Sequence, residues 1–272
     1  MIEHPALAPY VERYVGLRCE PLLVRLYLER GAQLAGYDPL VLDNLLARCV
    51  VNEATGWEGL PPENGAEGYL LPVPLQRLWV DARGYPLWAA TPFLPSPDVE
   101  GDVFYRHKRQ QDGQWTRGAR GMFRIVATEG RWRDRRTPVP TQAASWWEAE
   151  CVGNAMEIGR LLAQVYAAGK ERGKGYGMVH HWEIDAMESF HLMLPDECGF
   201  WRLTRSIPAL AIEMLSGAVP QEAPVLTAWT PPQWKPSLYA VGWPMGTAVE
   251  IDWMADINGR VQHGGPGGED GN

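Results

Sequence analysis

The sequence has few cysteines and none of the spacings that cysteine-based sites use. Its four cysteines, Cys19, Cys49, Cys151 and Cys198, lie far apart and form no CxxC pair, which argues against a disulfide framework and a structural zinc site. No HExxH motif and no paired-carboxylate metal motif occurs either. We therefore expect no metal, no other cofactor, and reduced thiols that are buried.

Long apolar runs are also missing. No run approaches the roughly 20 residues of a membrane span. The first residues, MIEHPALAPYVERYVG, are interrupted by Pro5, Pro9 and charged side chains where a signal peptide has an apolar segment. These absences predict a soluble, cytoplasmic protein with no membrane partner. A length of 272 residues suits one large domain or two small ones.

Positive charge is scarce overall but concentrated in one segment. The formal net charge is −8, which by itself argues against a general nucleic-acid binder. Between Val103 and Thr137, however, ten Arg and Lys face only three Asp and Glu, while the rest of the chain holds 15 Arg and Lys against 30 Asp and Glu. Such asymmetry within one chain indicates local contact with nucleic acid.

The basic segment also carries aromatic side chains, including Tyr105, Trp115, Phe123 and Trp132. Cations interleaved with aromatic rings suit a single-stranded nucleic acid, because the cations follow the backbone while the rings stack on bases. A solvated hairpin whose arginines pair with local acids is the alternative, and three acids are too few for that. The candidate residues here are Arg106, Lys108, Arg109, Trp115, Arg117, Arg120 and Arg124.

A second basic stretch lies between a predicted helix and a predicted strand. Asn154 is a suitable N-cap with Glu157 three residues later, and the helix is expected to end at Gly169. The loop that follows can bring backbone N–H groups close to an anion. It is neither GxxxxGK[ST] nor a GxGxxG after a strand, and an ordinary solvated turn is the alternative. Its candidate RNA-binding residues are Gly169, Lys170, Arg172, Gly173, Lys174, Gly175, Tyr176 and Gly177.

The order of the expected elements predicts an α+β fold. A strand at Pro21–Leu28 precedes a helix that starts at Asp38-Pro39 and buries Leu42, Leu45, Leu46, Cys49 and Val50. Short strands at 77–80 and 87–91 come before the basic segment, and a strand at 144–152, the capped helix and a strand at 178–184 come after it. This order is the ferredoxin-like βαββαβ plan, shared with the RNA-recognition fold whose sheet carries nucleic acid on one face.

Four stretches resemble one family. The stretch AGKERGKGYGMVHHWEI is similar to the glycine-rich loop of the RAMP superfamily of CRISPR-associated proteins. PLVLDNLLARCVV, YRHKRQQDG and WTPPQWKP resemble the first helix, the thumb and the C-terminal region of the type IV effector subunit that caps the 5′ handle of the guide RNA. The resemblance covers about Cys19 to Val249 and implies one RRM-like domain, 19–261, with a basic insertion at about 103–137. Residues 1–18 are then an extension and 262–272 a disordered tail.

The resemblance implies a non-catalytic subunit of a multisubunit ribonucleoprotein in defence against viruses and plasmids. Its partners would be the crRNA 5′ handle, the repeated backbone subunit, the large subunit, and target DNA near its adjacent motif. The glycine-rich loop would contact RNA, and Arg106, Lys108 and Arg109 would belong to the thumb that separates handle from guide.

A metal-independent endoribonuclease that processes precursor RNA is the alternative, because His107, His180 and His181 accompany the cations. Adjacent residues of a strand point to opposite faces, so at most one of His180 and His181 is expected at a shared site. A module that binds only proteins is a third hypothesis.

Overall fold

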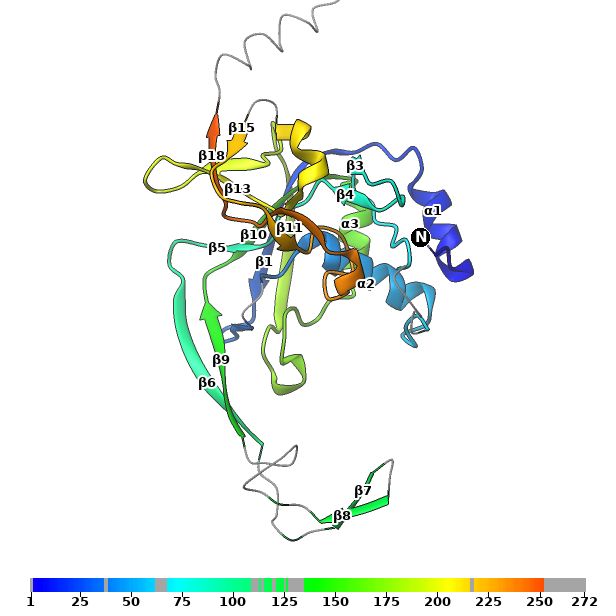
Figure 1. Cartoon of the computed structure of the whole chain (residues 1–272), viewed down its shortest axis with the longest axis vertical. Coiled ribbons are helices and arrows are strands. Elements are labelled where there is room, and N and C mark those ends of the chain that lie inside the picture. The colour runs from blue at the N-terminus through cyan, green and yellow to red at the C-terminus, as the bar shows by residue number, and fades with distance from the viewer. Residues whose placement is uncertain are drawn as a thin grey trace, which may run out of the picture.

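The computed structural model has an α+β fold with mostly antiparallel sheets and few helices (Figure 1). It describes residues 2–36, 39–61, 68–108, 113, 115–118, 121–124, 126, 135–215 and 218–251; the predicted tail lies outside these ranges. The α-helices in them are α1 (Ala8–Tyr14), α2 (Leu42–Ala54) and α3 (Ala155–Leu162). None of these helices has the length and apolar character that crossing a bilayer requires.

A four-stranded antiparallel sheet lies at the centre of the fold. Its strands are β1 (Glu20–Leu28), β5 (Leu94–Pro95), β10 (Trp147–Gly153) and β11 (Val179–Ala186). They pair in the order β11-β1-β10-β5. Along the chain, α2 follows β1 and α3 follows β10, so the sheet and its helices run β1, α2, β5, β10, α3, β11. The strands predicted around Pro21–Leu28, 144–152 and 178–184 are therefore confirmed, with small shifts at their ends.

One face of this sheet is apolar and is covered by α2 and α3. Buried side chains recur at every second position of β1 and β10, as the pleat of a strand requires; they are Leu22, Val24, Leu26, Trp147, Ala149 and Cys151. Residues paired directly across the two strands share a face, so these side chains form one surface. Leu46 of α2 and Leu161 of α3 are both 0% exposed against it.

The predicted buried thiols are confirmed at two of the four cysteines. Cys49 on α2 and Cys151 on β10 lie in this core, and burial raises the pKa of each thiol to about 12. Neither is a thiolate near neutral pH, which removes both as nucleophiles. Cys19 is half-buried and Cys198 is exposed.

The helix α2 has the predicted buried residues but begins later than predicted. Leu42, Leu46, Cys49 and Val50 are buried and Leu45 is half-buried. The helix starts at Leu42, not at Asp38-Pro39, and its N-cap residue makes no side-chain cap hydrogen bond. Val41 is extended because it pairs with Pro92, and the carbonyl of Leu40 accepts a hydrogen bond from the N–H of Phe93, next to β5. Asp38 itself lies outside the described residues.

Of the two hydrogen bonds expected for the cap of α3, the one accepted by the Asn154 side chain is confirmed and the one from the Glu157 side chain is not formed. The side-chain oxygen of Asn154 accepts a hydrogen bond from the N–H of Glu157 at 3.0 Å. The carboxylate of Glu157 does not return to the cap, because it pairs with Arg13 and Arg160. The N–H of Asn154 donates instead to the carbonyl of Pro74 at 3.0 Å.

The end predicted for this helix is wrong. It ends at Leu162, several residues before Gly169. The intervening segment pairs with the chain that returns toward β11: Ala167 forms a bridge with Met178, and the N–H of Ala168 donates to Gly177. Backbone pairing with a distant segment therefore replaces the helical hydrogen bonds that the glycine was expected to terminate.

The predicted N-terminal extension docks through apolar side chains, among them Leu7 and Tyr14, which pack in the core, and through charged side chains that contact the two helices. Arg13 of α1 forms an ion pair with Glu157 of α3. Arg160 lies between Glu157, at 3.0 Å, and Glu53 of α2, at 2.7 Å. The extension is thus attached to the outer side of the helical layer by a network that spans α1, α2 and α3.

The C-terminal part of the chain forms a second core with the hairpin of β3 (Arg77–Val80) and β4 (Pro86–Trp88). Strand β3 matches the strand predicted at 77–80, whereas β4 overlaps the strand predicted at 87–91 only at Leu87 and Trp88. Its remaining strands are β12 (Met193–Pro195), β13 (Trp201–Leu203), β14 (Ile207–Pro208), β15 (Ala218–Pro220), β16 (Val225–Thr227), β17 (Ala240–Trp243) and β18 (Ala248–Ile251). Among the residues that the structure describes, the 3-10 helices are η1 (Pro5–Leu7), η3 (Arg172–Lys174), η4 (Ala209–Leu215) and η5 (Pro236–Leu238). Trp229 of the predicted Pro- and Trp-rich region is 1% exposed and lies in this core.

A long ribbon leaves the body at the position of the predicted basic insertion (Figure 1). It consists of β6 (Glu100–Lys108) and β9 (Arg135–Ala143), and β2 (Leu34–Ala35) pairs with β9 at its base. A short hairpin of β7 (Trp115–Gly118) and β8 (Gly121–Arg124) belongs to the segment that joins the two long strands.

The guanidinium of Arg205 connects the two cores. Its side chain is 3% exposed, and its Nη2 lies 3.1 Å from Oδ2 of Asp43 on α2, which is 0% exposed. The same guanidinium donates to the carbonyls of Trp88, Ala90 and Trp229. Burial raises the pKa of Asp43, and the adjacent positive charge opposes that rise.

We expect Arg205→Ala to lower the free energy of unfolding by about 3–5 kcal/mol, because it leaves the Asp43 carboxylate buried without its cation. Chemical denaturation measures this loss. Arg202→Ala is the matched control, since Arg202 forms an ion pair with Asp196 at 2.7 Å but is 44% exposed, and such pairs contribute about 1 kcal/mol or less. Equal losses in the two variants would contradict a linking role for Arg205.

Candidate nucleic-acid interface

The glycine-rich loop depends on glycine at specific positions. Gly169, Gly175 and Gly177 have φ angles of 79°, 87° and 66°, a region that other residues rarely adopt. A Cβ on Gly177 would lie 1.8 Å from the carbonyl oxygen of Ala168, whereas one on Gly173 would meet nothing within 4 Å. Gly177 is therefore required for close packing within the protein, and Gly173 is not required for packing.

Backbone hydrogen bonds attach the loop to β2 and the residues beside it. The N–H of Gly177 donates to the carbonyl of Gln33 at 2.8 Å, and the N–H of Lys170 donates to Ala35 at 3.2 Å. The N–H of Gly36 then donates to Pro140 of β9 at 3.0 Å. The loop is thus connected through β2 to the base of the ribbon, although the two predicted basic segments are far apart in sequence.

Side chains from the loop and the ribbon also meet directly. Tyr176 stacks on Phe104 of β6, with ring centroids 4.7 Å apart and planes within 13°. Glu171 accepts a hydrogen bond from Arg106 of β6 at 3.0 Å and pairs with Lys174 at 2.8 Å. The structure therefore brings seven of the predicted residues, Arg106 and six from the loop, into one surface, which we call the loop–ribbon surface (Lys170–Tyr176 with Phe104 and Arg106).

Glu171 and Phe104 belong to this surface but were not predicted. The sequence held a signal for Phe104, because Phe104 and Arg106 are two residues apart on β6 and therefore lie on the same face of the strand. Nothing in the sequence indicated Glu171, because it stands among cations in a loop that is expected to be exposed to solvent. Hydrogen bonds from Lys174, and from Arg106, hold the pKa of Glu171 below its ordinary value, so it is ionised at neutral pH.

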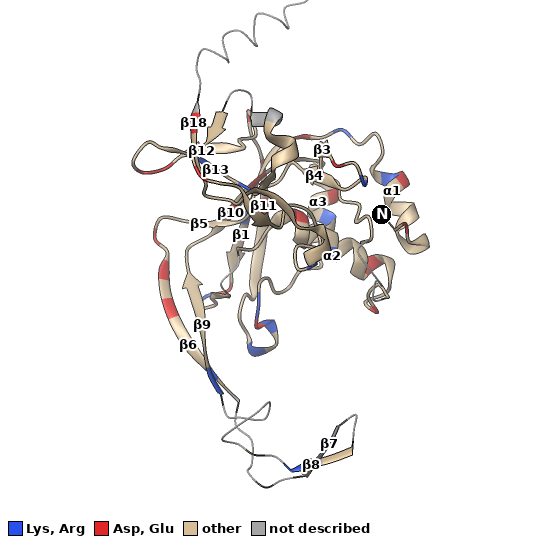
Figure 2. Cartoon of the chain, in the orientation of Figure 1, with Lys and Arg blue, Asp and Glu red and all other residues tan. Residues whose placement is uncertain are grey.

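The loop–ribbon surface keeps a net positive charge. Lys170, Arg172, Lys174 and Arg106 outnumber the one carboxylate of Glu171. Arg172 is exposed, and no ion pair involving it is formed within the described residues. Figure 2 shows the loop as a basic cluster beside the ribbon.

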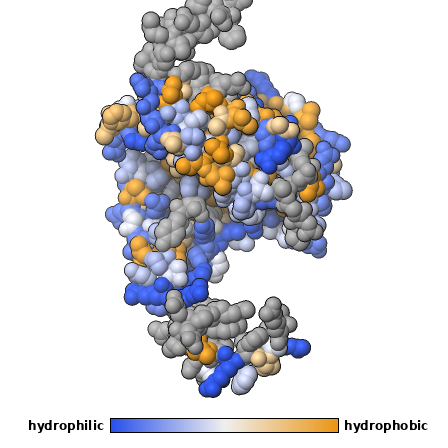
Figure 3. Space-filling view, in the orientation of Figure 1, coloured by the Kyte–Doolittle hydropathy of each residue, from blue (hydrophilic) through white to orange (hydrophobic). Residues whose placement is uncertain are grey.

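The charge of the ribbon changes along its length (Figure 2). Glu100 and Asp102 lie near its base, whereas Arg106 and the directly paired Lys108 and Arg135 lie in its outer half. The outer half also appears as a hydrophilic band in the space-filling view (Figure 3). Cations therefore continue outward from the loop–ribbon surface along β6 and β9.

Aromatic rings accompany these cations. The guanidinium of Arg136 lies 3.7 Å from the ring centroid of Tyr105, which is 45% exposed. In the β7–β8 hairpin Trp115 is 66% exposed and pairs across the ladder with Arg124, while Arg117 pairs with Met122. Two further predicted residues, Arg109 and Arg120, lie outside the described residues.

The open face of the central sheet has the opposite charge. Pairing across the strands puts Glu148 and Glu183 on the same face as Arg25, and Glu150 and Asp185 on that face one pleat away. Arg25 contacts Glu148 at 3.4 Å and Asp185 at 2.8 Å. Four carboxylates against one arginine repel a phosphate backbone, so this face does not match the nucleic-acid-binding sheet of the RNA-recognition fold.

Strand alternation predicted that at most one of His180 and His181 would lie at a shared site, and the structure differs from this prediction. The register between β1 and β11 shifts at Tyr27 and Leu28, where Tyr27 pairs with His181 and Leu28 with Val179, so His180 is bulged. The two histidine rings are consequently 4.8 Å apart. His181 stacks on Tyr27 at 4.3 Å.

Glu183 extends this group. Its carboxylate accepts a hydrogen bond from the hydroxyl of Tyr27 at 2.9 Å and lies 3.4 Å from Nε2 of His181. That hydrogen bond raises the pKa of the Tyr27 hydroxyl. His107 is separate from the group: it lies on the ribbon, where it pairs with Arg136.

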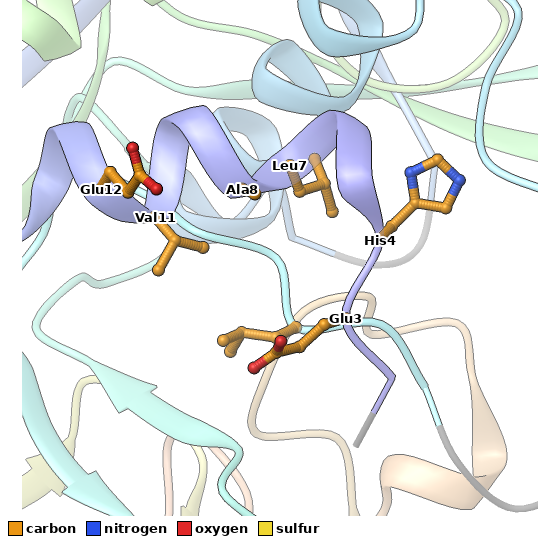
Figure 4. A pocket seen from close by; sticks show the side chains of 7 residues that line it. Glu3, His4, Leu7, Ala8, Val11 and Glu12 are labelled. Carbon is orange, nitrogen blue, oxygen red and sulfur yellow. The ribbon is translucent and has the colours of Figure 1, made fainter.

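Two other features do not contribute to the interface. A small pocket beside α1 has Leu7, Val11 and Leu70 in its walls with Glu3 and Glu12 at its sides, and it contains none of the predicted RNA-binding residues (Figure 4). In the ranges that the structure describes, no three His, Cys, Asp or Glu side chains are grouped so that they could hold a metal ion.

No protein-family model matches the chain, and no curated protein matches its sequence. A binding surface is therefore inferred from the contacts and charges described above.

We expect Gly177→Ala to destabilise the loop by about 2 kcal/mol, because alanine is strained at this φ and its methyl group would collide with the Ala168 carbonyl. Gly173→Ala is the matched control and should have little effect, since its Cβ would point into open space. Amide hydrogen exchange of residues 166–178 measures the difference. Equal protection in the two variants would contradict a packing role for Gly177.

Proposed function

We propose that this chain is a non-catalytic RNA-binding protein that uses the loop–ribbon surface. The observation that carries the proposal is the contact between the two predicted basic segments, through Arg106, Glu171 and Lys174 and through the stacked rings of Phe104 and Tyr176. A continuous track of cations with neighbouring aromatic rings suits a flexible single strand, whose phosphates and bases are both accessible.

The distribution of charge supports RNA on this surface and not on the sheet. The chain as a whole has a net charge of −8, so a bound strand must remain near the loop and the outer ribbon. The carboxylates on the open face of the sheet repel a strand that strays across it. An acidic protein can therefore bind RNA along one restricted path.

The element order supports a ferredoxin-like core. With β1, β5, β10 and β11 counted as first to fourth, their order across the sheet is fourth, first, third, second, and neighbouring strands are antiparallel. Helices follow the first and third strands. A split βαβ arrangement of this kind is the basis of the ferredoxin-like plan, to which the RAMP superfamily belongs.

Within that superfamily, we assign the chain to the type IV CRISPR effector subunit that caps the crRNA 5′ handle. The glycine-rich loop would bind the handle, and the ribbon with its β7–β8 hairpin would act as the thumb between handle and guide. On this assignment the repeated backbone subunit, the large subunit and the target DNA near its adjacent motif are its other partners. The assignment comes from the sequence resemblance.

We expect Lys170→Ala and Lys174→Ala each to weaken binding of repeat-derived RNA. Each lost phosphate contact should also reduce the slope of log K against log salt concentration by about 0.7 for a single strand. Fluorescence anisotropy over a salt series measures both quantities. Arg18→Ala is the control, because Arg18 is an exposed cation just before β1, away from the loop. Unchanged affinity and slope in both lysine variants would refute the assignment of the loop.

A metal-independent endoribonuclease is the second candidate, and the bulge at His180 favours it. Two imidazoles with rings 4.8 Å apart can act as base and acid in one transesterification. One would take the proton of a 2′-hydroxyl as its oxygen bonds to phosphorus, and the other would protonate the departing 5′-oxygen. The adjacent Glu183 carboxylate opposes this activity, because it repels the phosphate.

Incubation with labelled repeat–spacer RNA in EDTA separates the two candidates. For a capping subunit, we expect a shifted band on a native gel and intact RNA on a denaturing gel. Shortened RNA with a 2′,3′-cyclic phosphate end, lost in His180→Ala or His181→Ala, would establish the nuclease instead. Neither a shift nor cleavage would favour a module that binds only proteins.

A further inference from the structure

The contact between Arg106, Lys174 and Glu171 has the form of an occupied anion site. Arg106 lies on the ribbon, 65 residues before Glu171 in the sequence, and Lys174 lies in the same loop as Glu171. Both cations contact the one carboxylate of Glu171. Arg106 contacts Oε1 at 3.0 Å and Lys174 contacts Oε2 at 2.8 Å. Each carboxylate oxygen thus meets one cation, which is how two cations would share the two non-bridging oxygens of a phosphodiester.

The backbone of Glu171 is held in a conformation that a glutamate rarely adopts. Its φ is 56°, and the other non-glycine residue with a positive φ among those described is Trp57. Such a conformation costs free energy and persists when surrounding contacts impose it. Here the backbone is held by hydrogen bonds from the N–H of Lys174 to the Glu171 carbonyl, at 2.9 Å, and from the N–H of Lys170 to Ala35, while the two ion pairs hold the side chain, which is 17% exposed.

The surroundings suit a nucleotide better than an isolated anion. The stacked rings of Phe104 and Tyr176 lie next to the cations, and the ammonium of Lys174 is 5.7 Å from the centroid of Phe104. Phosphate recognition by two cations beside an aromatic pair is a common chemistry for single-stranded nucleic acid. A protein carboxylate has no comparable use for the aromatic pair.

We propose that Arg106 and Lys174 form a binding site for one backbone phosphate of single-stranded RNA, and that the Glu171 carboxylate occupies this site until RNA displaces it. This inference rests on the proposed RNA-binding function. It gives Glu171 a role of its own: a competitor that lowers affinity for weak or non-specific strands, and that must leave before the loop and ribbon contact the backbone together.

The test is the affinity for a fluorescein-labelled single-stranded RNA of about 16 nucleotides over a range of NaCl concentrations. Glu171→Gln removes the competing charge, and Glu171→Gly also relieves the left-handed backbone. We expect both variants to bind RNA about fivefold more tightly at low salt, because the two cations no longer have to leave a protein carboxylate before they contact a phosphate. The salt slope should steepen by about 0.7 for each cation released to RNA.

Matched variants isolate the effect. Glu197→Gln makes the same change of charge in the exposed turn between β12 and β13, where no ion pair of Glu197 is formed among the described residues; its affinity should change less than about twofold, because distant exposed charges are screened. In an Arg106→Ala background, Glu171→Gln should give a smaller gain. Thermal unfolding checks that each variant is folded.

The outcomes distinguish the two levels of the hypothesis. Unchanged or weaker binding by both Glu171 variants, with normal binding by the unmodified protein, would overturn the competition and leave RNA binding intact. Weaker binding in particular would show that Glu171 positions the two cations. Absence of RNA binding by every protein would overturn the proposed function and this inference together.

Discussion

The buried pair of Arg205 and Asp43 is the constraint on which the arrangement of the two cores depends. One guanidinium forms an ion pair with a carboxylate on α2 and donates to the carbonyls of Trp88, Ala90 and Trp229. A buried charge without a partner costs several kcal/mol, so these groups cannot separate independently. The pair therefore fixes the end of β4 and the Trp229 segment against the helix that covers the central sheet.

Negative and positive side chains are concentrated on different secondary-structure elements of this fold. The sheet face opposite the helices collects carboxylates from β10 and β11, while cations collect in the loop after α3 and in the outer ribbon (Figure 2). Apolar side chains are exposed mainly elsewhere, and several of them, such as Leu226, which is 66% exposed, and the directly paired Val241, lie in the C-terminal region. The proposed path for RNA is thereby narrow, and the remaining surface is left for other contacts.

The glycines of the glycine-rich loop differ in what the structure requires of them. Gly177 is required because the protein's own backbone approaches it, whereas Gly173 leaves open space beside the chain. Glu171 lies between Gly169 and Gly173 and adopts a left-handed backbone conformation although it is not a glycine. Two cations contact its carboxylate. Tight packing at Gly177 thus supports a polar, more open segment before it, and both parts contact the ribbon, through Tyr176 and through Glu171.

The sequence by itself determined the periodic features: the alternation of Leu22, Val24 and Leu26, the buried face of α2, and the cap at Asn154. These follow from local geometry, in which side chains repeat every two or 3.6 residues and a cap bonds within one turn. Only the tertiary structure decided the start of α2, the end of α3, the bulge that joins His180 to His181, and the contacts of Arg205 and Glu171. Each of these depends on pairing between segments far apart in the chain, and neither periodicity nor residue type encodes which distant partner a backbone or a charge will meet.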